Sequence, residues 1–387
     1  MKNKAKILLF NTLILLFLII FFESTAYIAR KLLGKVSVGW IYRTDAQTLV
    51  LEEFPCAKME THPVFSHVPD HRGDCKILGG YSNGPFVEYS KKKQDNSIVV
   101  LGGSTTSGFY QHYAKGKTWP FVLNEILENE NYKYDVINGG HGGYSSSEEL
   151  LQLLLNVRRL DRNIRIVISL NGINNLYLEN RKNTFLNDRV VEMYERQMWI
   201  NQSFPSRFMP NISSFIRYFS PESQLKSEMG KRKNNIINET KKMSNVEIWE
   251  SDIKIMHAIS KSMGAEYFVF LQPTMGLNNA QSIMPSDQNS NDAKMLSFIL
   301  HDQGGAEGYS RGYREKLNDV YDQLRARCKV IEFCFDITNI APPSSNNNYN
   351  NPRHHNENGN QLIAYAIFNI LKKKIIKQLM SKIININ

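Results

Sequence analysis

Ser104 stands out first in this sequence, because its hydroxyl lies on a glycine-rich turn. The segment 101–108 follows a β-branched run and reads Leu-Gly-Gly-Ser-Thr-Thr-Ser-Gly, which predicts a tight turn from a strand into a helix. The N–H groups of a helix N-terminus favour a developing negative charge, as a nucleophilic serine requires. An ordinary helix N-cap is the alternative interpretation. A phosphate-binding loop is excluded, because Phe109-Tyr110 stands where that motif requires Lys and then Ser or Thr.

Three later segments bring the other groups that acyl transfer requires. Gly143 lies in a segment with four glycines after the next predicted strand, and Asn174 places a side-chain amide after the strand that follows. A polar loop before the last helix carries His354 and His355. A general base, backbone donors and an amide that converge on a hydroxyl are the parts of an acyl-transfer site.

These residues follow the strands of a predicted α/β fold. Near-continuous apolar strands alternate with amphipathic helical patterns, which is typical of a mainly parallel sheet covered by helices on both faces. The five predicted strands span residues 97–102, 134–138, 164–170, 266–271 and 330–336, and the helices span 119–129, 147–159, 246–263, 313–327 and about 357–382. Ligands bind at the carboxyl ends of the strands in such a sheet, so the candidate residues are expected at one edge.

The N-terminal segment has the pattern of a membrane helix. Three lysines precede an apolar run over residues 7–22, which further small and apolar residues extend to 29. We favour an uncleaved anchor over 7–29, and a signal peptide cleaved near Ser24-Thr25-Ala26 is the alternative. Either interpretation places the rest of the chain outside the cytoplasm, in the periplasm or at the cell surface.

The remainder divides into two expected parts. Residues 30–95 lack periodicity and carry turn signals, so a stalk and an irregular cap are predicted. Residues 96–387 hold the strands, the helices and the candidate site. Within them, residues 177–245 are rich in Asn, Lys, Arg and Ser and predict an inserted, partly helical segment.

Charge and cysteine content narrow the class of partner. The net charge is +10, from 47 Lys and Arg against 37 Asp and Glu, and the sequence has neither zinc-finger spacing nor an aromatic-basic RNA signature. Nucleic acid is therefore excluded as a partner, whereas an anionic membrane surface, an acidic glycan and plain solvated surface all fit. The same choice holds for the basic tail 372–382, where a solvated helix end is favoured over contact with anionic lipid.

The four cysteines are not arranged as a metal or redox site, because no Cys-x-x-Cys occurs. Cys56 and Cys75 bracket a short stretch and are able to pair in an oxidising compartment. Cys328 and Cys334 lie six residues apart in an apparent strand, and an extended strand would hold them too far apart to bridge.

Taken together, the four segments resemble the SGNH hydrolase superfamily, also called GDSL esterases and lipases, over roughly residues 96–372. The resemblance implies a flavodoxin-like three-layer α/β/α sandwich with a five-stranded sheet. It also implies that Ser104 is the nucleophile and His354 the base. The oxyanion hole is then formed by the N–H groups of Ser104 and Gly143 and the amide of Asn174.

Two positions depart from the family pattern. Asn175 replaces a usual Asp, which is expected to affect local packing only. Asn351 stands where the third triad member is usually Asp, and an amide cannot stabilise an imidazolium by charge. In serine proteases the same exchange lowers turnover by about 10⁴-fold through the wrong histidine tautomer. Asp336 and Glu357 are candidate substitutes for that carboxylate, and His355 is an alternative base.

The resulting expectation is a serine esterase that hydrolyses an acyl ester, with O-acetyl as one candidate, on a cell-surface glycan or lipid. It requires no cofactor and no metal. Two alternatives belong to other classes: a catalytically degenerate protein that binds glycans or scaffolds the cell envelope, and a polysaccharide O-acyltransferase.

Overall fold

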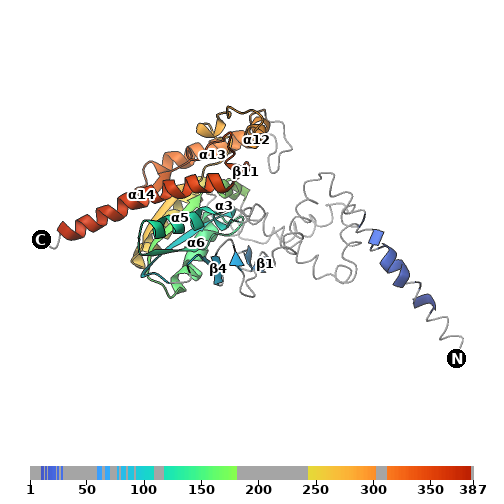
Figure 1. Cartoon of the computed structure of the whole chain (residues 1–387), viewed down its shortest axis with the longest axis horizontal. Coiled ribbons are helices and arrows are strands. Elements are labelled where there is room, and N and C mark those ends of the chain that lie inside the picture. The colour runs from blue at the N-terminus through green and yellow to red at the C-terminus, as the bar shows by residue number, and fades with distance from the viewer. Residues whose placement is uncertain are drawn as a thin grey trace, which may run out of the picture. The chain divides into compact units, whose positions relative to one another are not determined.

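The structure is a computed structural model of the whole chain (Figure 1). It describes residues 86–90, 93–108, 117–180, 243–301 and 312–384, the strand segments 59–62, 66–69, 76–77 and 80–83, and part of 10–28. Most of the predicted insertion 177–245 and of the predicted stalk 30–95 lies outside the described residues, as do Cys56 and Cys75.

The chain divides into two compact units. One comprises residues 1–53 and 189–241, and its described residues, between 10 and 28, are helical. The other comprises residues 54–188 and 242–387 and holds the sheet and every candidate site residue. Nowhere in the described chain is there a helix with the length and apolarity needed to cross a bilayer. The predicted fold class, which included a transmembrane helix over 7–29, is corrected on this point.

The central sheet is mixed, mostly parallel and larger than the five strands predicted, which is the second correction to the predicted fold class. Its described strands follow the order β10-β9-β8-β6-β7-β5-β4-β3. The first five are parallel: β10 (Cys334–Asp336), β9 (Glu266–Leu271), β8 (Ile164–Asn171), β6 (Asn96–Gly102) and β7 (Tyr134–Asn138). The antiparallel strands β5 (Phe86–Glu88), β4 (Gly80–Asn83) and β3 (Lys76–Ile77) extend the sheet beyond β7.

The antiparallel strands escaped sequence analysis because they are short. They have two to four residues each and include Gly, Ser and Asn, so they show neither an apolar run nor an alternating pattern. They form because β7 would otherwise be an edge strand with unpaired backbone groups. Val87 of β5 pairs with Asn138 and so covers that edge.

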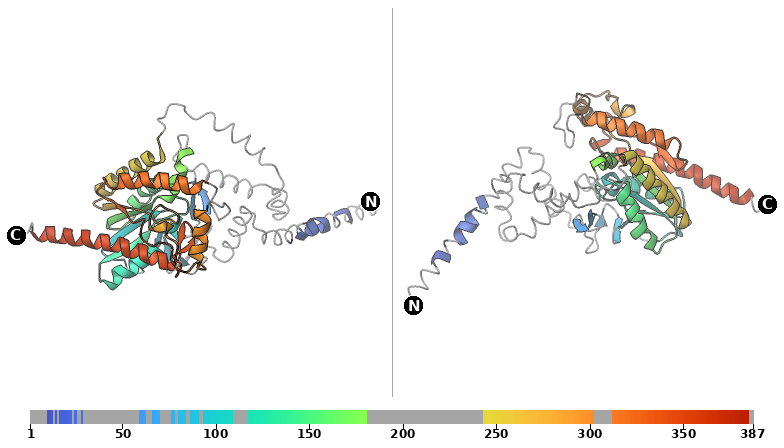
Figure 2. Two further views of the ribbon diagram at one scale, coloured as in Figure 1. Left: turned by 90° about the horizontal axis from the view of Figure 1, so that it is seen from above. Right: turned by 180° about the vertical axis from the view of Figure 1, so that it is seen from behind.

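Helices cover both faces of the sheet (Figures 1 and 2). Ile98 and Val100 of β6 pack into one core with α5 (Trp119–Asn129) and α14 (Glu357–Ile384). Val99 and Leu101 alternate to the other face, as successive residues of a strand do. The core on that face includes residues of α6 (Ser146–Leu155), α11 (Asn245–Ser262), α12 (Asn291–Leu300) and α13 (Tyr313–Cys328).

Short elements complete the described structure. They are α3 (Ser104–Ser107), η2 (Val157–Arg159), η3 (Ile173–Asn180), η4 (Ala280–Ser282) and the antiparallel pairs β1 (Met59–His62) with β2 (Ser66–Pro69) and β11 (Tyr349–Asn351) with β12 (His354–His355). We call residues 349–355, which contain β11, the following turn and β12, the histidine loop.

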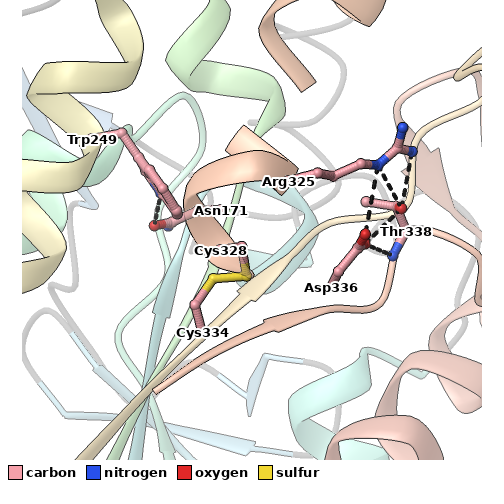
Figure 3. Close-up of a disulfide and its surroundings, with 7 residues drawn as sticks. All are labelled: Asn171, Trp249, Arg325, Cys328, Cys334, Asp336 and Thr338. Carbon is pink, nitrogen blue, oxygen red and sulfur yellow. Dashed lines mark hydrogen bonds and ion pairs between the residues drawn. A yellow bond between two sulfur atoms is a disulfide. The ribbon is translucent and has the colours of Figure 1, made fainter. Parts of the chain in front are cut away.

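Cys328 and Cys334 form a disulfide, with their Cα atoms 5.1 Å apart (Figure 3). The prediction that they lie too far apart is wrong, because the strand begins later than expected. Cys328 is the last residue of α13, a turn follows, and only Cys334 belongs to β10. The N–H of Cys334 donates to the carbonyl of Ile331 at 3.0 Å, which folds the chain back.

Candidate active site

Ser104 lies where β6 ends and α3 begins, at the carboxyl edge of the parallel strands. Two glycines make this sharp turn possible. Gly102 has φ of 153°, and a Cβ there would lie 2.1 Å from Thr106 Oγ1. A Cβ on Gly103 would lie 2.1 Å from Asn174 Nδ2. The second glycine therefore lets the Asn174 amide approach the backbone beside Ser104.

The hydroxyl of Ser104 is in hydrogen-bond contact with His354, 250 residues later in the sequence. Ser104 Oγ lies 2.6 Å from His354 Nε2, and Ser104 is half-buried. His354 belongs to β12, where it pairs with Asn351 of β11. The sheet edge and the histidine loop thus bring together the two residues that the sequence singles out as nucleophile and base.

Asn351 orients the imidazole of His354. Its Oδ1 accepts the backbone N–H groups of Arg353 at 3.1 Å and His354 at 3.2 Å, and lies 2.8 Å from His354 Nδ1. Two backbone donors require an acceptor at that position, so the oxygen of the amide faces the ring and not its NH₂ group. His354 Nδ1 therefore carries the proton, and Nε2 is left to accept one from the Ser104 hydroxyl.

His354 is neutral at neutral pH. Burial, and then the positive charge of the neighbouring Arg353, hold the pKa of its imidazole well below the usual range. The side chain is 9% exposed. A neutral imidazole whose Nε2 accepts the Ser104 hydroxyl has the protonation state that a general base requires.

Asn174 and Gly143 lie on the two loops beside the serine. Asn174 Nδ2 donates to the carbonyl of Tyr144 at 2.8 Å, which joins the loop after β8 to the loop after β7. Gly143 immediately precedes Tyr144 and has φ of 79°, in the left-handed region that favours glycine. The contact with Gly103 places the Asn174 amide next to the Ser104 turn.

The other candidates named from the sequence are engaged elsewhere. Asp336 accepts hydrogen bonds from Thr338 and lies 3.6 Å from Arg325, as Figure 3 shows, so it is not the partner of His354 Nδ1. His355 is buried, its ring packs against Tyr349 at 4.4 Å, and burial lowers its pKa to about 3.

The remaining two positions lie outside the contact between serine and histidine. Glu357 is the first residue of α14. Asn175 donates from Nδ2 to Ser146 Oγ at 2.9 Å, in the buried layer beneath the loops. Asn351, not Asp336 or Glu357, is therefore the residue that contacts His354 Nδ1.

Sequence analysis missed two side chains that hold the histidine loop. Asp292 of α12 accepts the backbone N–H groups of Ser344, Asn348 and Tyr349 at 2.9, 2.7 and 3.3 Å and so anchors the start of the loop. Gln272 binds the far end of the loop. Gln272 directly follows β9, and its position at a strand end was the signal that would have marked it.

A buried glutamate lies beneath the loop after β8. Glu149 is 1% exposed, and its Oε1 accepts a hydrogen bond from Asn171 Nδ2 at 2.6 Å. Asn171 Oδ1 in turn accepts from the indole of Trp249 at 3.1 Å (Figure 3). Burial raises the pKa of Glu149 to about 8, so its carboxyl is largely protonated at neutral pH.

Replacing Glu149 with Gln is expected to remove part of the pH dependence of folding. The unfolded carboxyl ionises near pH 4.5, whereas the folded one keeps its proton to about pH 8. Between those values the folded state binds more protons, so the free energy of unfolding falls as pH rises, by up to about 1.4 kcal/mol per pH unit. Glu149→Gln keeps the acceptor for Asn171 and carries no charge.

Urea denaturation of both proteins at pH 5 and pH 8 measures this difference. The free energy of unfolding of the variant, minus that of wild type, should be larger at pH 8 than at pH 5. Equal shifts of the two proteins between these pH values would show that Glu149 is not buried in its protonated form.

Within the described ranges, no cluster of three or more His, Cys, Asp or Glu side chains is placed to hold a metal ion.

No protein-family model and no curated protein matches this sequence. Among solved structures it is similar to the psychrotrophic esterase EstA from Pseudoalteromonas sp., with 12% identity, a TM-score of 0.36 and coverage of 73% of this chain and 99% of that one. It is also similar to the acetyl xylan esterase AlAXEase, with 11% identity, a TM-score of 0.30 and coverage of 71% of this chain and 98% of that one. A GDSL-like lipase from Bacteroides thetaiotaomicron has 10% identity and a TM-score of 0.36, with coverage of 74% of this chain and 91% of that one. At these identities and TM-scores, function has to be inferred from the geometry of the site.

Proposed function

We propose that this chain is a serine esterase of the SGNH type, with Ser104 as nucleophile and His354 as general base. The observation that carries the proposal is the 2.6 Å contact between Ser104 Oγ and His354 Nε2, in a ring whose Nδ1 faces the oxygen of Asn351. A nucleophile bound to a base that a third group orients is the arrangement that activates serine for acyl transfer.

In the first half of the reaction, Ser104 Oγ attacks the ester carbonyl while His354 Nε2 takes the hydroxyl proton. The N–H groups of Ser104 and Gly143 and the Asn174 amide stabilise the oxyanion. One N–H of that amide is bonded to Tyr144 and holds the group in place, and the other donates to the substrate. The ester C–O bond then breaks, and the proton on His354 passes to the departing alcohol.

In the second half, His354 takes a proton from water as the water attacks the acyl-serine. The bond between Ser104 Oγ and the acyl carbon breaks, the proton returns to Ser104, and the carboxylic acid leaves. Each proton moves through the same imidazole, so the cycle needs no cofactor.

The proposed substrate is an acyl ester, of which O-acetyl is one candidate, on a glycan or lipid outside the cytoplasm. The Cys328–Cys334 disulfide supports this location, because disulfides persist in oxidising compartments. The net charge of +10 suits an acidic carrier. To test the choice of carrier, the protein is incubated with an O-acetylated polysaccharide and the released acetate is measured.

An activated-serine probe tests the proposed function directly. A fluorophosphonate should phosphonylate Ser104, and peptide mass spectrometry should find the added mass on that residue. The base must be neutral to react, and the pKa of His354 is lowered. The labelling rate should therefore still be near its maximum at pH 6.5 and should drop only at a clearly lower pH. Labelling spread over several serines, or none, would favour a binding protein without turnover.

A further inference from the structure

The side-chain amide of Gln272 connects the nucleophile turn to the histidine loop. Its Nε2 donates to Thr105 Oγ1 at 2.9 Å and to the carbonyl of Arg353 at 3.1 Å. Thr105 follows Ser104, and Arg353 precedes His354. One amide group therefore binds the neighbour of each residue in the proposed catalytic pair.

The groups that form this link are buried and all contact one another. Gln272 is 3% exposed and Thr105 is 6% exposed. The hydroxyl of Thr105 also donates to the carbonyl of Arg353, at 3.5 Å, so the three groups contact one another. Buried hydrogen bonds of this kind are geometrically strict, because an unmade bond leaves a polar group without water.

Gln272 is itself held by the sheet. Its backbone N–H donates to the carbonyl of Asn171 at 2.7 Å, and its carbonyl accepts the hydroxyl of Tyr321 at 3.1 Å. The residue thus continues the pairing of β9 with β8 by one position beyond Leu271. Its amide projects from the end of β9 toward the Ser104 turn and the histidine loop.

We propose that Gln272 is a positioning residue, which sets the distance between Ser104 and His354 by holding Thr105 and Arg353 together. This inference rests on the proposed function. Gln272 acts through its two partners and has no contact with the reacting atoms. Displacing a catalytic group by about 1 Å costs about 10²-fold in rate, so the residue affects the chemical step more than substrate binding.

The test replaces Gln272 with Met, which has similar length and no hydrogen-bonding amide. With 4-nitrophenyl acetate, kcat should fall by about 10²-fold and KM should change little. The fluorophosphonate should label Ser104 more slowly by a similar factor. The matched control is Asn124→Leu in α5, which removes another buried amide with two hydrogen bonds, to Val136 and Glu128, away from the site. It should lower the melting temperature and leave kcat unchanged.

Substitutions at Thr105 test the same link independently, and they can be used if Gln272→Met does not fold. Thr105→Val removes the acceptor for Gln272 and should lower kcat, whereas Thr105→Ser keeps the hydroxyl and should retain wild-type kcat. In the double variant Thr105→Val with Gln272→Met, the loss should be smaller than the product of the single losses, because both remove one link.

Three results would overturn the inference. The first is a folded Gln272→Met protein that is labelled at the wild-type rate. The second is equal kcat in Thr105→Val and Thr105→Ser. The third is a loss of kcat in Asn124→Leu as large as that in Gln272→Met, which would show general destabilisation. An unlabelled wild-type protein would instead refute the proposed function, and this inference with it.

Discussion

Ser104→Ala is expected to lower the rate of ester hydrolysis by about 10⁴-fold or more and to leave the fold intact. The nucleophilic oxygen is lost, and in serine hydrolases only the oxyanion donors and substrate binding then remain to accelerate attack by water. The fold should survive because alanine is a good helix former at the first position of α3. Turnover of 4-nitrophenyl acetate measures the effect, and circular dichroism checks the fold.

Ser107→Ala is the matched control for this prediction. Its hydroxyl lies on the same short helix but donates to the carbonyl of Ser104 at 3.1 Å. This variant should keep its esterase activity. Adding His354→Ala to Ser104→Ala should cause little further loss, because the two residues act as one unit. A Ser104→Ala protein with wild-type turnover would place the reaction elsewhere in the molecule.

Much of this arrangement follows from sequence because strand ends and turn residues carry strong local signals. β7 and β9 begin and end where the apolar runs predict, and β6 and β8 differ by one residue. Since the carboxyl ends of parallel strands meet at one edge, a serine after β6 and an asparagine after β8 were bound to lie near each other. The structure adds the contact of Ser104 with His354, which no local pattern determines.

The features that sequence missed depend on tertiary contacts. β3, β4 and β5 are too short for a pattern, and they extend the sheet in turn from β7, with which only β5 pairs directly. The last predicted strand began at Val330. In the structure Val330 is 80% exposed and lies in the turn that allows Cys328 and Cys334 to bond. The direction of the Asn351 amide is likewise set by its surroundings and not by its residue type.

Asn351 illustrates that last difference most clearly. The comparison with serine proteases predicts the wrong histidine tautomer, because an amide in place of a carboxylate is able to turn its NH₂ group toward the ring. Here the N–H groups of Arg353 and His354 occupy Oδ1 together with the ring. A flipped amide would set its NH₂ group against two backbone donors, so the flip is disfavoured. The asparagine therefore provides the orientation that a carboxylate gives, without its charge.

Asn351→Leu is consequently expected to lower kcat by about 10³- to 10⁴-fold, close to the cost of a wrong tautomer in serine proteases. Leucine has the same branching at Cγ and leaves His354 Nδ1 and two backbone N–H groups without their acceptor. The Ser104 hydroxyl is untouched, so the variant separates orientation of the base from loss of the nucleophile. Steady-state kinetics at pH 8, where the imidazole is neutral in either protein, measure the effect. Retained turnover in Asn351→Leu would show that another group orients the histidine.

Asn351→Asp tests the same position in the opposite direction. The carboxylate accepts the same three hydrogen bonds and adds a negative charge beside the imidazole, which raises the pKa of His354. The imidazolium that forms during attack is stabilised, so kcat at pH 8 should rise by about tenfold if the charge contributes about 1.4 kcal/mol. Because a base with a raised pKa becomes protonated at higher pH, the acid limb of the activity profile should move to higher pH. A gain in kcat with no movement of that limb would contradict this account, since both effects come from the one added charge.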